Sequence, residues 1–465
     1  MRAIVTSLLL LVSIPATASD PSAMEQRFQA LEQRLLALES ILLERERTIA
    51  EQNQRIDSLE QGVIVEETVA ATGLTGEERA ALRSFRELEP ILYRAQERAG
   101  YNYGRPDRYI QLPGTDTAIE LGGHVWQDVI YDNRETDNKA GFQPSSMPTV
   151  AQRNSNESTF SAGPSKFYLK SFTPTRWGDM RTRVEWDFFQ SDGNADFNLT
   201  HLWGELAGIG AGKTFSNFMD ITAFPNILDF WGPNSMVFTR RSQFRYTWGL
   251  ESGDLAISME EPGTDITFAD GIAADGRNEL PDFVLSYHTE GDWGHFKAAG
   301  VMRQIAAEAL NGSGRKDQDT GWGINLTGSL NFWERDRVVA QIAFGEGIAS
   351  LMNDPCCSVV SGNDGGVDQR GDMEAIEAWG AYLYFDHWWS EKWSSSVGYS
   401  YVALDPLDMQ VDEAFDNSLY TSANLIWYPF EPLKIGLEVM YGEVEDKIGR
   451  VSENTRYQAS LAFKF

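Results

Sequence analysis

Residues 456–465 read RYQASLAFKF, and the segment alternates between two kinds of side chain. The odd-numbered positions are apolar: Tyr457, Ala459, Leu461, Phe463 and Phe465. The even-numbered positions are polar or small: Arg456, Gln458, Ser460, Ala462 and Lys464. Successive side chains of a strand point to opposite faces, so this period of two predicts a β-strand with one apolar face. Such segments of about ten residues are typical of transmembrane β-barrels with a wet lumen.

The same alternation recurs upstream, most clearly at 322–332, 433–441 and 184–188. It predicts strands at 119–131, 163–173, 180–190, 197–207, 208–214, 236–248, 253–259, 282–289, 294–303, 319–332, 336–346, 374–385, 393–403, 416–428, 432–443 and 453–465. The total is about sixteen, an even number, as a single-chain bacterial barrel requires. Sixteen strands enclose an aqueous channel, whereas eight would be filled by side chains.

A soluble sandwich would show similar alternation, but aromatic residues near the segment ends favour a barrel with girdles at the membrane interfaces. These aromatics are Tyr131, Trp186, Tyr246, Trp248, Trp393, Trp427, Tyr428 and Tyr441. We therefore predict an all-β transmembrane fold over 119–465, a sixteen-stranded antiparallel barrel preceded by an α-helical coiled coil.

The N-terminus is typical of a secretory signal peptide. Met1-Arg2 is followed by an apolar run at 4–14 and the small residues Ala16-Thr17-Ala18. A membrane anchor is the alternative, but about 11 apolar residues are too few for the roughly 20 that span a bilayer. We predict a signal peptide over 1–18.

A heptad repeat follows the signal peptide. Its two sets of core positions are Phe28, Leu35, Leu42, Ile49, Ile56 and Val63, and Leu31, Leu38, Arg45, Gln52 and Leu59. This repeat predicts a coiled coil over 19–66, and mixed Leu and Ile at its core favour three or more strands. One amphipathic helix folded onto its own domain is the alternative. Residues 67–118 are predicted to be a short helix, with a capping box at Thr75 and Glu78, and a linker.

Composition narrows the function. The formal net charge is −29, which argues against nucleic acid as a partner. The two cysteines, Cys356 and Cys357, are adjacent, and the five histidines lie far apart in sequence. A disulfide framework and a Cys-rich or His-x-x-x-His metal site are therefore excluded, and we predict no cofactor and no metal site.

Two phrases of the sequence resemble the DcaP-like trimeric porins. One is Leu112–Thr117 before Leu121-Gly122-Gly123, and the other runs from Lys213 to Tyr246, including Phe218-Met219-Asp220, Leu228-Asp229-Phe230 and Gly232-Pro233. The resemblance implies a sixteen-stranded homotrimer in the outer membrane with a periplasmic coiled coil. It also implies an inward constriction loop at about 215–235 and uptake of small organic anions such as dicarboxylates.

Parity within the predicted strands assigns charged residues to the lumen. On 236–248 and 294–303, the parity that carries the large apolar residues is expected to face lipid, so the other parity faces the lumen. Together with the inward parity of 180–190, this places six cations in the lumen: Arg181, Arg183, Arg241, Arg245, Lys297 and Arg303. Guanidinium forks bind carboxylates bidentately, so these residues suit an anion-selective wall. We expect Asp220 and Asp229 of the constriction loop to face Arg241 and Arg245, which would create a transverse field. The alternative is that the lumen cations only pair with neighbouring acids.

The predicted function is passive diffusion of small organic anions through an arginine-lined constriction in the cell outer membrane. Outer-membrane lipid and lipopolysaccharide would surround the barrel, and the coiled coil would lock the trimer or reach peptidoglycan. A trimeric adhesin or a tether to the cell wall is the first alternative. An outer-membrane enzyme is the second, but the chain has no Gly-x-Ser-x-Gly motif.

Overall fold

The computed structural model describes residues 110–465 apart from 270–273, 278, 310–315, 334 and 358–360. The predicted signal peptide, coiled coil and short helix lie outside these residues.

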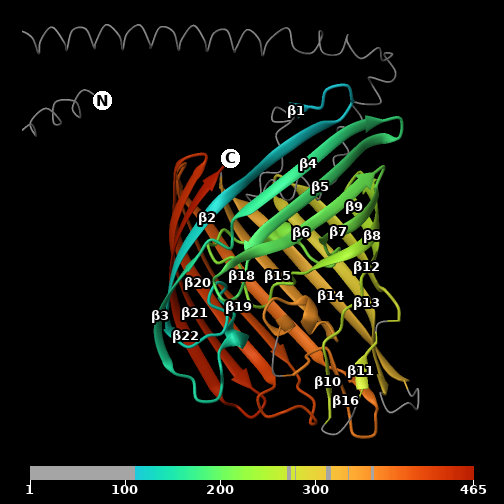
Figure 1. The fold of residues 1–465 in the computed structure, drawn as a ribbon, viewed down its shortest axis with the longest axis vertical. Coiled ribbons are helices and arrows are strands. Elements are labelled where there is room, and N and C mark those ends of the chain that lie inside the picture. The colour runs from blue at the N-terminus through green and yellow to red at the C-terminus, as the bar shows by residue number, and fades with distance from the viewer. Residues whose placement is uncertain (1–109, 270–273, 278, 310–315, 334, 358–360) are drawn as a thin grey trace, which may run out of the picture. The chain divides into compact units, whose positions relative to one another are not determined.

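The described chain forms a closed antiparallel barrel of sixteen strand positions (Figure 1). In ring order these are β2 (Ala118–Arg134), β3 (Asn154–Ser161) with β4 (Lys166–Thr175), β5 (Gly178–Phe189), β6 (Ala195–Leu206), β7 (Ile209–Phe215), β8 (Arg240–Leu250), β9 (Gly253–Glu260), β12 (Asp282–Gly291), β13 (Gly294–Ala309), β14 (Lys316–Phe332), β15 (Asp336–Glu346), β18 (Glu377–Ser390), β19 (Trp393–Leu404), β20 (Phe415–Phe430), β21 (Leu433–Asp446) and β22 (Val451–Lys464).

The alternating segment at the C-terminus closes the ring. Strand β22 pairs with β21 on one side and with β2 on the other, where Val129 lies opposite Ala459 and Tyr131 opposite Tyr457. Every strand of the ring therefore has two neighbours, and no edge is left for lipid to meet. The predicted sixteen-stranded antiparallel barrel is confirmed.

One strand position differs from the prediction. The predicted strands leave 132–162 as a connection, but β3 occupies 154–161 and pairs with the C-terminal part of β2 (128–134), while β4 pairs with its N-terminal part (118–124). Gly163 and Pro164 separate the two pieces, and a proline cannot donate to a strand ladder. The polar run Asn154–Thr159 shows no apolar parity, so alternation alone did not reveal β3.

The two ends of the barrel differ in their connections. Turns of two or three residues join the strands at one end, whereas most connections at the other end are much longer. The four longest of these loops are called L1 (135–153), L3 (216–239), L4 (261–281) and L6 (347–376). Short turns at the periplasmic end and long loops outside are the pattern of outer-membrane barrels.

The remaining elements are short. Strand β1 (Ile110–Gln111) extends the ring beside β2, and β11 (Ala274–Gly276) extends it beside β13. In L4 and L6, β10 (Ile266–Phe268), β16 (Gly365–Val367) and β17 (Met373–Ala375) form a separate small sheet. The helices η2 (Pro144–Ser146), η3 (Ile221–Ala223), η4 (Ala349–Leu351) and η5 (Pro355–Cys357) are single turns. No helix of the described residues is long and apolar enough to cross a membrane.

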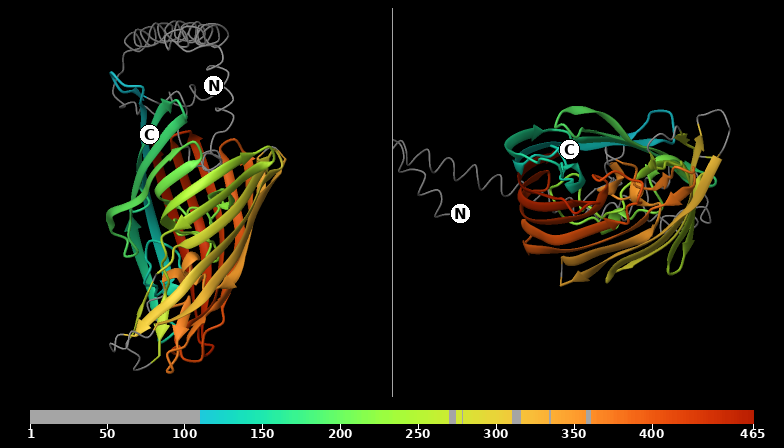
Figure 2. Two further views of the ribbon diagram at one scale, coloured as in Figure 1. Left: turned by 90° about the vertical axis from the view of Figure 1, so that its right-hand side faces the viewer. Right: turned by 90° about the horizontal axis from the view of Figure 1, so that it is seen from below.

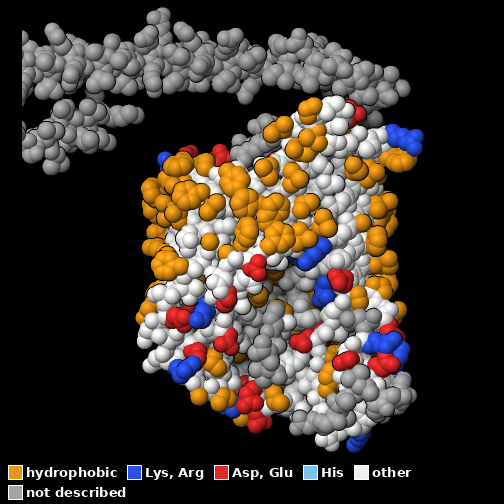
Figure 3. Space-filling view, viewed as in Figure 1, with side chains coloured by type: hydrophobic (Ala, Val, Ile, Leu, Met, Phe, Trp, Pro, Cys, Tyr) orange, Lys and Arg blue, Asp and Glu red, His pale blue; other side chains and the backbone are white. Residues whose placement is uncertain are grey.

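Apolar side chains cover the outside of the barrel. Phe244, Met302 and Leu437 are 65%, 61% and 63% exposed, and each belongs to the parity predicted to face lipid. Figure 3 shows such side chains gathered over the half nearer the short turns, with charged side chains towards the long loops.

The inside of the barrel is not an open bore. L3 enters it together with parts of L1 and L6, and the view from the long-loop end shows these segments within the ring (Figure 2). They bury an apolar core that includes Phe142, Phe218, Met219, Met236, Val237, Ile348, Met352, Tyr382, Tyr384 and Tyr420. The inward parity of β13 to β21 therefore carries apolar residues, such as Val301 and Val402, wherever a loop packs on it.

Candidate functional site

A cavity of about 830 Å³ lies at the short-turn end of the lumen. Its lining combines L3 residues 222–230 with residues of the turns, including Asp292, Trp333 and Pro432. L3 therefore forms the inner wall of the space that opens at this end.

L3 is fixed to the wall by polar contacts. The Asn325 side chain donates to the Phe218 carbonyl (2.8 Å), and the Tyr382 hydroxyl donates to the Ala223 carbonyl (2.9 Å). At the loop tip, the amides of Leu228 and Asp229 donate to the Glu438 carboxylate at 2.6 and 2.9 Å. These contacts on β14, β18 and β21 lay the loop along one side of the barrel.

Asp220 begins the η3 turn of L3 and binds β13. One carboxylate oxygen accepts the Thr222 amide at 3.0 Å, and the other lies 3.0 Å from Nε2 of His295. Burial opposes ionisation here, but His295 and Lys297 stabilise the charge and hold the pKa of Asp220 well below its usual range.

Asp229 lies at the tip of L3. It accepts the amides of Phe142 (3.1 Å), Trp231 (3.2 Å) and Gly232 (3.1 Å), and the Tyr420 hydroxyl at 3.1 Å. Burial raises the pKa of Asp229, although these donors oppose that effect. Asp229 thus joins L1 to L3.

Three of the predicted lumen cations make their polar contacts with neutral oxygens in the described chain. Arg245 donates to the Phe215 carbonyl (2.6 Å) and to Oε1 of Gln243, and Lys297 donates to the Met219 carbonyl at 2.6 Å. Arg241 approaches the Glu261 and Gly263 carbonyls at 3.4 Å. Acidic side chains also act on these cations at longer range: Asp282 and Asp364 on Arg241, Glu260 on Arg245, and Asp220 on Lys297.

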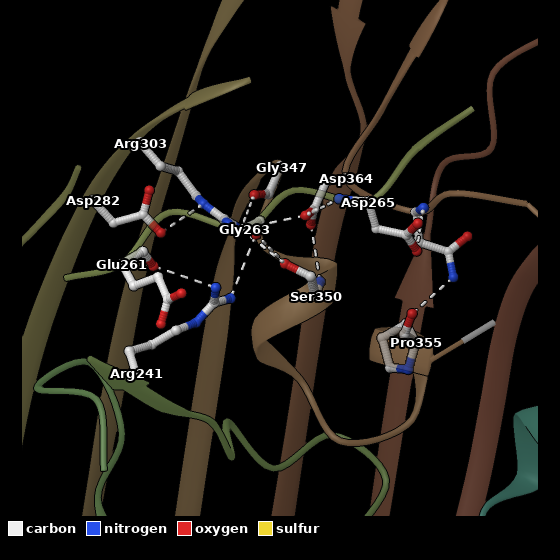
Figure 4. A network of polar contacts seen from close by, with 11 residues as sticks. Arg241, Glu261, Gly263, Asp265, Asp282, Arg303, Gly347, Ser350, Pro355 and Asp364 are labelled. Atoms are coloured by element: carbon white, nitrogen blue, oxygen red, sulfur yellow. Dashed lines mark hydrogen bonds and ion pairs between the residues drawn. The ribbon is translucent and has the colours of Figure 1, made fainter. Parts of the chain in front are cut away.

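Two other predicted cations are ion-paired. Arg183 is buried on β5, and its Nε lies 3.2 Å from Glu185, which also binds Lys166 at 3.0 Å. Arg303 joins Asp282 (3.3 Å) and Asp364 (3.4 Å), as Figure 4 shows. For these two residues, pairing with neighbouring acids is the arrangement that the structure shows.

Arg181 also lies on the inward parity of β5. It is half-buried, and its guanidinium carbon lies 5.8 Å from the centre of the Phe172 ring.

The structure brings some of the predicted residues together but not in the predicted arrangement. Arg245, Lys297 and Asp220 line one small cavity of about 80 Å³, whereas Asp229 lines the larger one. The expectation that both aspartates face Arg241 and Arg245 is therefore wrong for Asp229. Its tip position on L3 lies against β20 and β21, whereas Arg241 and Arg245 lie on β8.

Sequence reasoning missed three features of the lumen. Arg240 stacks on Phe215 and Phe238, with its guanidinium carbon 5.1 and 4.9 Å from the ring centres. The Lys434 ammonium lies 5.1 Å from the centre of the Trp126 ring. Lys434 lies on the inward parity of the predicted strand 432–443, so the sequence did contain a signal for its position in the lumen. The third feature, an aromatic contact between β5 and L3, had no signal in the sequence.

No group of three or more His, Cys, Asp or Glu side chains in the described residues is placed to hold a metal ion.

The architecture defines a class of protein. A closed barrel with an apolar outer belt, short turns at one end and long loops that fold into its interior is the architecture of outer-membrane channels.

The chain belongs to the Porin subfamily, whose profile matches residues 102–462. It is thus a porin of the outer membrane. The resemblance to DcaP-like porins is confirmed at the level of family and fold.

The chain is similar to several solved structures. The outer membrane channel DcaP of Acinetobacter baumannii is 18% identical, covers 77% of this chain and 99% of its own, and has a TM-score of 0.65. A loop-deletion mutant of OmpT, an outer membrane protein of Vibrio cholerae, is 10% identical, with 75% and 100% covered and a TM-score of 0.49. An anion-selective porin from Comamonas acidovorans is 13% identical, with the same coverage and TM-score. A search of curated protein sequences finds no match.

Proposed function

We propose that this porin is a passive diffusion channel for small organic anions of the dicarboxylate type. The observation that supports the proposal is the placement of three cations, Arg241, Arg245 and Lys297, whose hydrogen bonds in the described chain go to carbonyl and amide oxygens. Cations of this kind beside the loop that narrows the lumen attract anions and repel cations. Two carboxylates on one solute would engage two such side chains.

The test is planar-bilayer recording with a salt gradient across the membrane. The wild-type porin is expected to show a reversal potential of the sign for anion preference. The double variant Arg241→Ala/Arg245→Ala should lose most of that preference, because two positive charges leave the lumen wall. Arg153→Ala is the matched control, since Arg153 is exposed on L1 and paired with Glu135. Cation preference in wild type that stays unchanged in the double variant would refute the proposal.

We also propose that the porin is a homotrimer joined by its N-terminal coiled coil. The heptad repeat with mixed Leu and Ile core positions supports this state. Light scattering of the detergent-solubilised protein should give three times the mass of one chain. A monomeric mass for the complete mature chain would exclude the trimer.

A further inference from the structure

Three aromatic side chains meet between the barrel wall and L3. Phe189, the last residue of β5, stacks on Phe230 of L3 with ring centres 4.5 Å apart and an interplanar angle of 18°. The ring of Trp231 lies 5.6 Å from that of Phe189. We call Phe189, Phe230 and Trp231 the aromatic seal.

The seal joins L3 to a further part of the barrel wall. L3 is bound to β14, β18 and β21, whereas Phe189 belongs to β5, which β22, β2 and β4 separate from β21 in the ring. The stack of Phe189 on Phe230 therefore closes the space between the tip of L3 and β5.

The backbone around the seal is held from several directions. Glu438 binds the amides of Leu228 and Asp229, the two residues before Phe230. The Trp231 indole donates to the Asn353 carbonyl of L6 at 3.0 Å. The seal is thus anchored to β21 and L6.

L1 closes over the same rings. A Cβ added at Gly141 would lie 2.9 Å from Cβ of Trp231 and 3.2 Å from Cζ of Phe189. Glycine at this position allows the backbone of L1 to lie directly against the seal, since a Cβ would press on the side chains of Trp231 and Phe189.

The seal lies at the inner end of the large cavity. Phe230 lines the cavity of about 830 Å³, whereas Phe189 and Trp231 are not part of its lining. The seal therefore borders the cavity through Phe230 alone.

We propose that the aromatic seal is a hydrophobic gate, and that movement of the Phe230 ring away from Phe189 sets the conductance of the pore. An apolar constriction resists ions because it expels the water that solvates them. The gate controls how fast solutes pass, and the charged residues of the proposed function control which sign of charge passes.

Single-channel recording of Phe230→Ala and Phe189→Ala tests the gate. Each variant is expected to raise the conductance about twofold or more, because removal of one ring opens the constriction. The double variant should add little to either single variant, since both remove the same contact. Phe188→Ala is the matched control: Phe188 has the opposite parity on the same strand and contacts Phe167. It should conduct as wild type does.

Phe230→Leu separates gating from folding, since leucine keeps an apolar side chain at the tip but removes the stack. We expect a smaller rise in conductance with unchanged heat stability of the barrel. Wild-type conductance in all of the folded seal variants would overturn the gate, as would an equal rise in Phe188→Ala. A changed reversal potential with unchanged conductance would also overturn it, whereas the anion proposal is judged by the reversal potential alone.

Discussion

The carboxylate of Glu438 holds the tip of L3 through two backbone amides, at 2.6 and 2.9 Å. Leu228 and Asp229 are each 2% exposed, so their amides would be buried without a partner if the carboxylate were removed. A buried donor without a partner costs about 1–3 kcal/mol. One side chain on β21 therefore fixes the backbone at the tip of L3.

Glu438→Ala should loosen the tip and raise the current noise of the open channel, with a loss of about 1–3 kcal/mol in the free energy of unfolding. Single-channel recording and urea titration in lipid vesicles measure the two effects. Glu443→Ala is the control, because Glu443 lies on the outward parity of the same strand, where Tyr441 donates to it. Equal effects of the two variants would remove this role of Glu438.

At the scale of elements, L4 and L6 form a clasp over the long-loop end of the barrel. Strand β10 pairs with β16 in parallel, and the Asp364 carboxylate accepts the amides of Asp265 (3.0 Å) and Ser350 (2.9 Å). Arg303 donates to the Gly347 carbonyl at 2.9 Å and to Asp364 (Figure 4). Two loops and a barrel strand therefore meet at one buried acid.

The clasp should respond to pH through Asp265. Burial and the neighbouring Asp364 carboxylate raise the pKa of Asp265 to about 6, although the Asn363 amide opposes this. Since the folded-state pKa lies above its ordinary value, the ionised form is the one that the clasp disfavours. We expect the clasp to be less stable above pH 6 and to gain stability as pH falls through 6.

Hydrogen exchange of the β10 and β16 amides measures this dependence. Exchange should be slower at pH 5 than at pH 7.5 after correction for the intrinsic rate, and Asp265→Asn should remove the difference. Asp275→Asn, on exposed β11 of the same loop, should keep it. A pH difference that survives in Asp265→Asn would assign the effect to another group.

For the whole molecule, stability depends on lipid contact all around the ring. Leu437 is 63% exposed on the outer face, between Leu425 of β20 and Ala459 of β22. Leu437→Lys should lower the free energy of unfolding by about 2–4 kcal/mol, because a charge near the bilayer midplane loses its hydration. Leu437→Ala should cost clearly less. Folding titrations in vesicles compare the two, and equal costs would place Leu437 away from lipid.

Alternation predicted the barrel and its two faces with few errors. Phe296 and Met302 face outward and Lys297 and Arg303 inward, as expected from the parity of one strand. Strand β3 was missed because its polar residues carry no parity signal. The contacts of the lumen residues were not predictable, since Asp220 and His295 are 75 positions apart in the chain.

The sequence by itself determined a closed barrel with a lipid-facing and an inward parity. These follow from a period of two residues that any strand between lipid and lumen must obey. Only the tertiary structure decided what fills the interior: the course of L3 along β14, β18 and β21, the carbonyl partners of Arg245 and Lys297, and the stack of Phe189 on Phe230. Such contacts join residues far apart in the chain, and their geometry depends on loops whose local sequence carries no period.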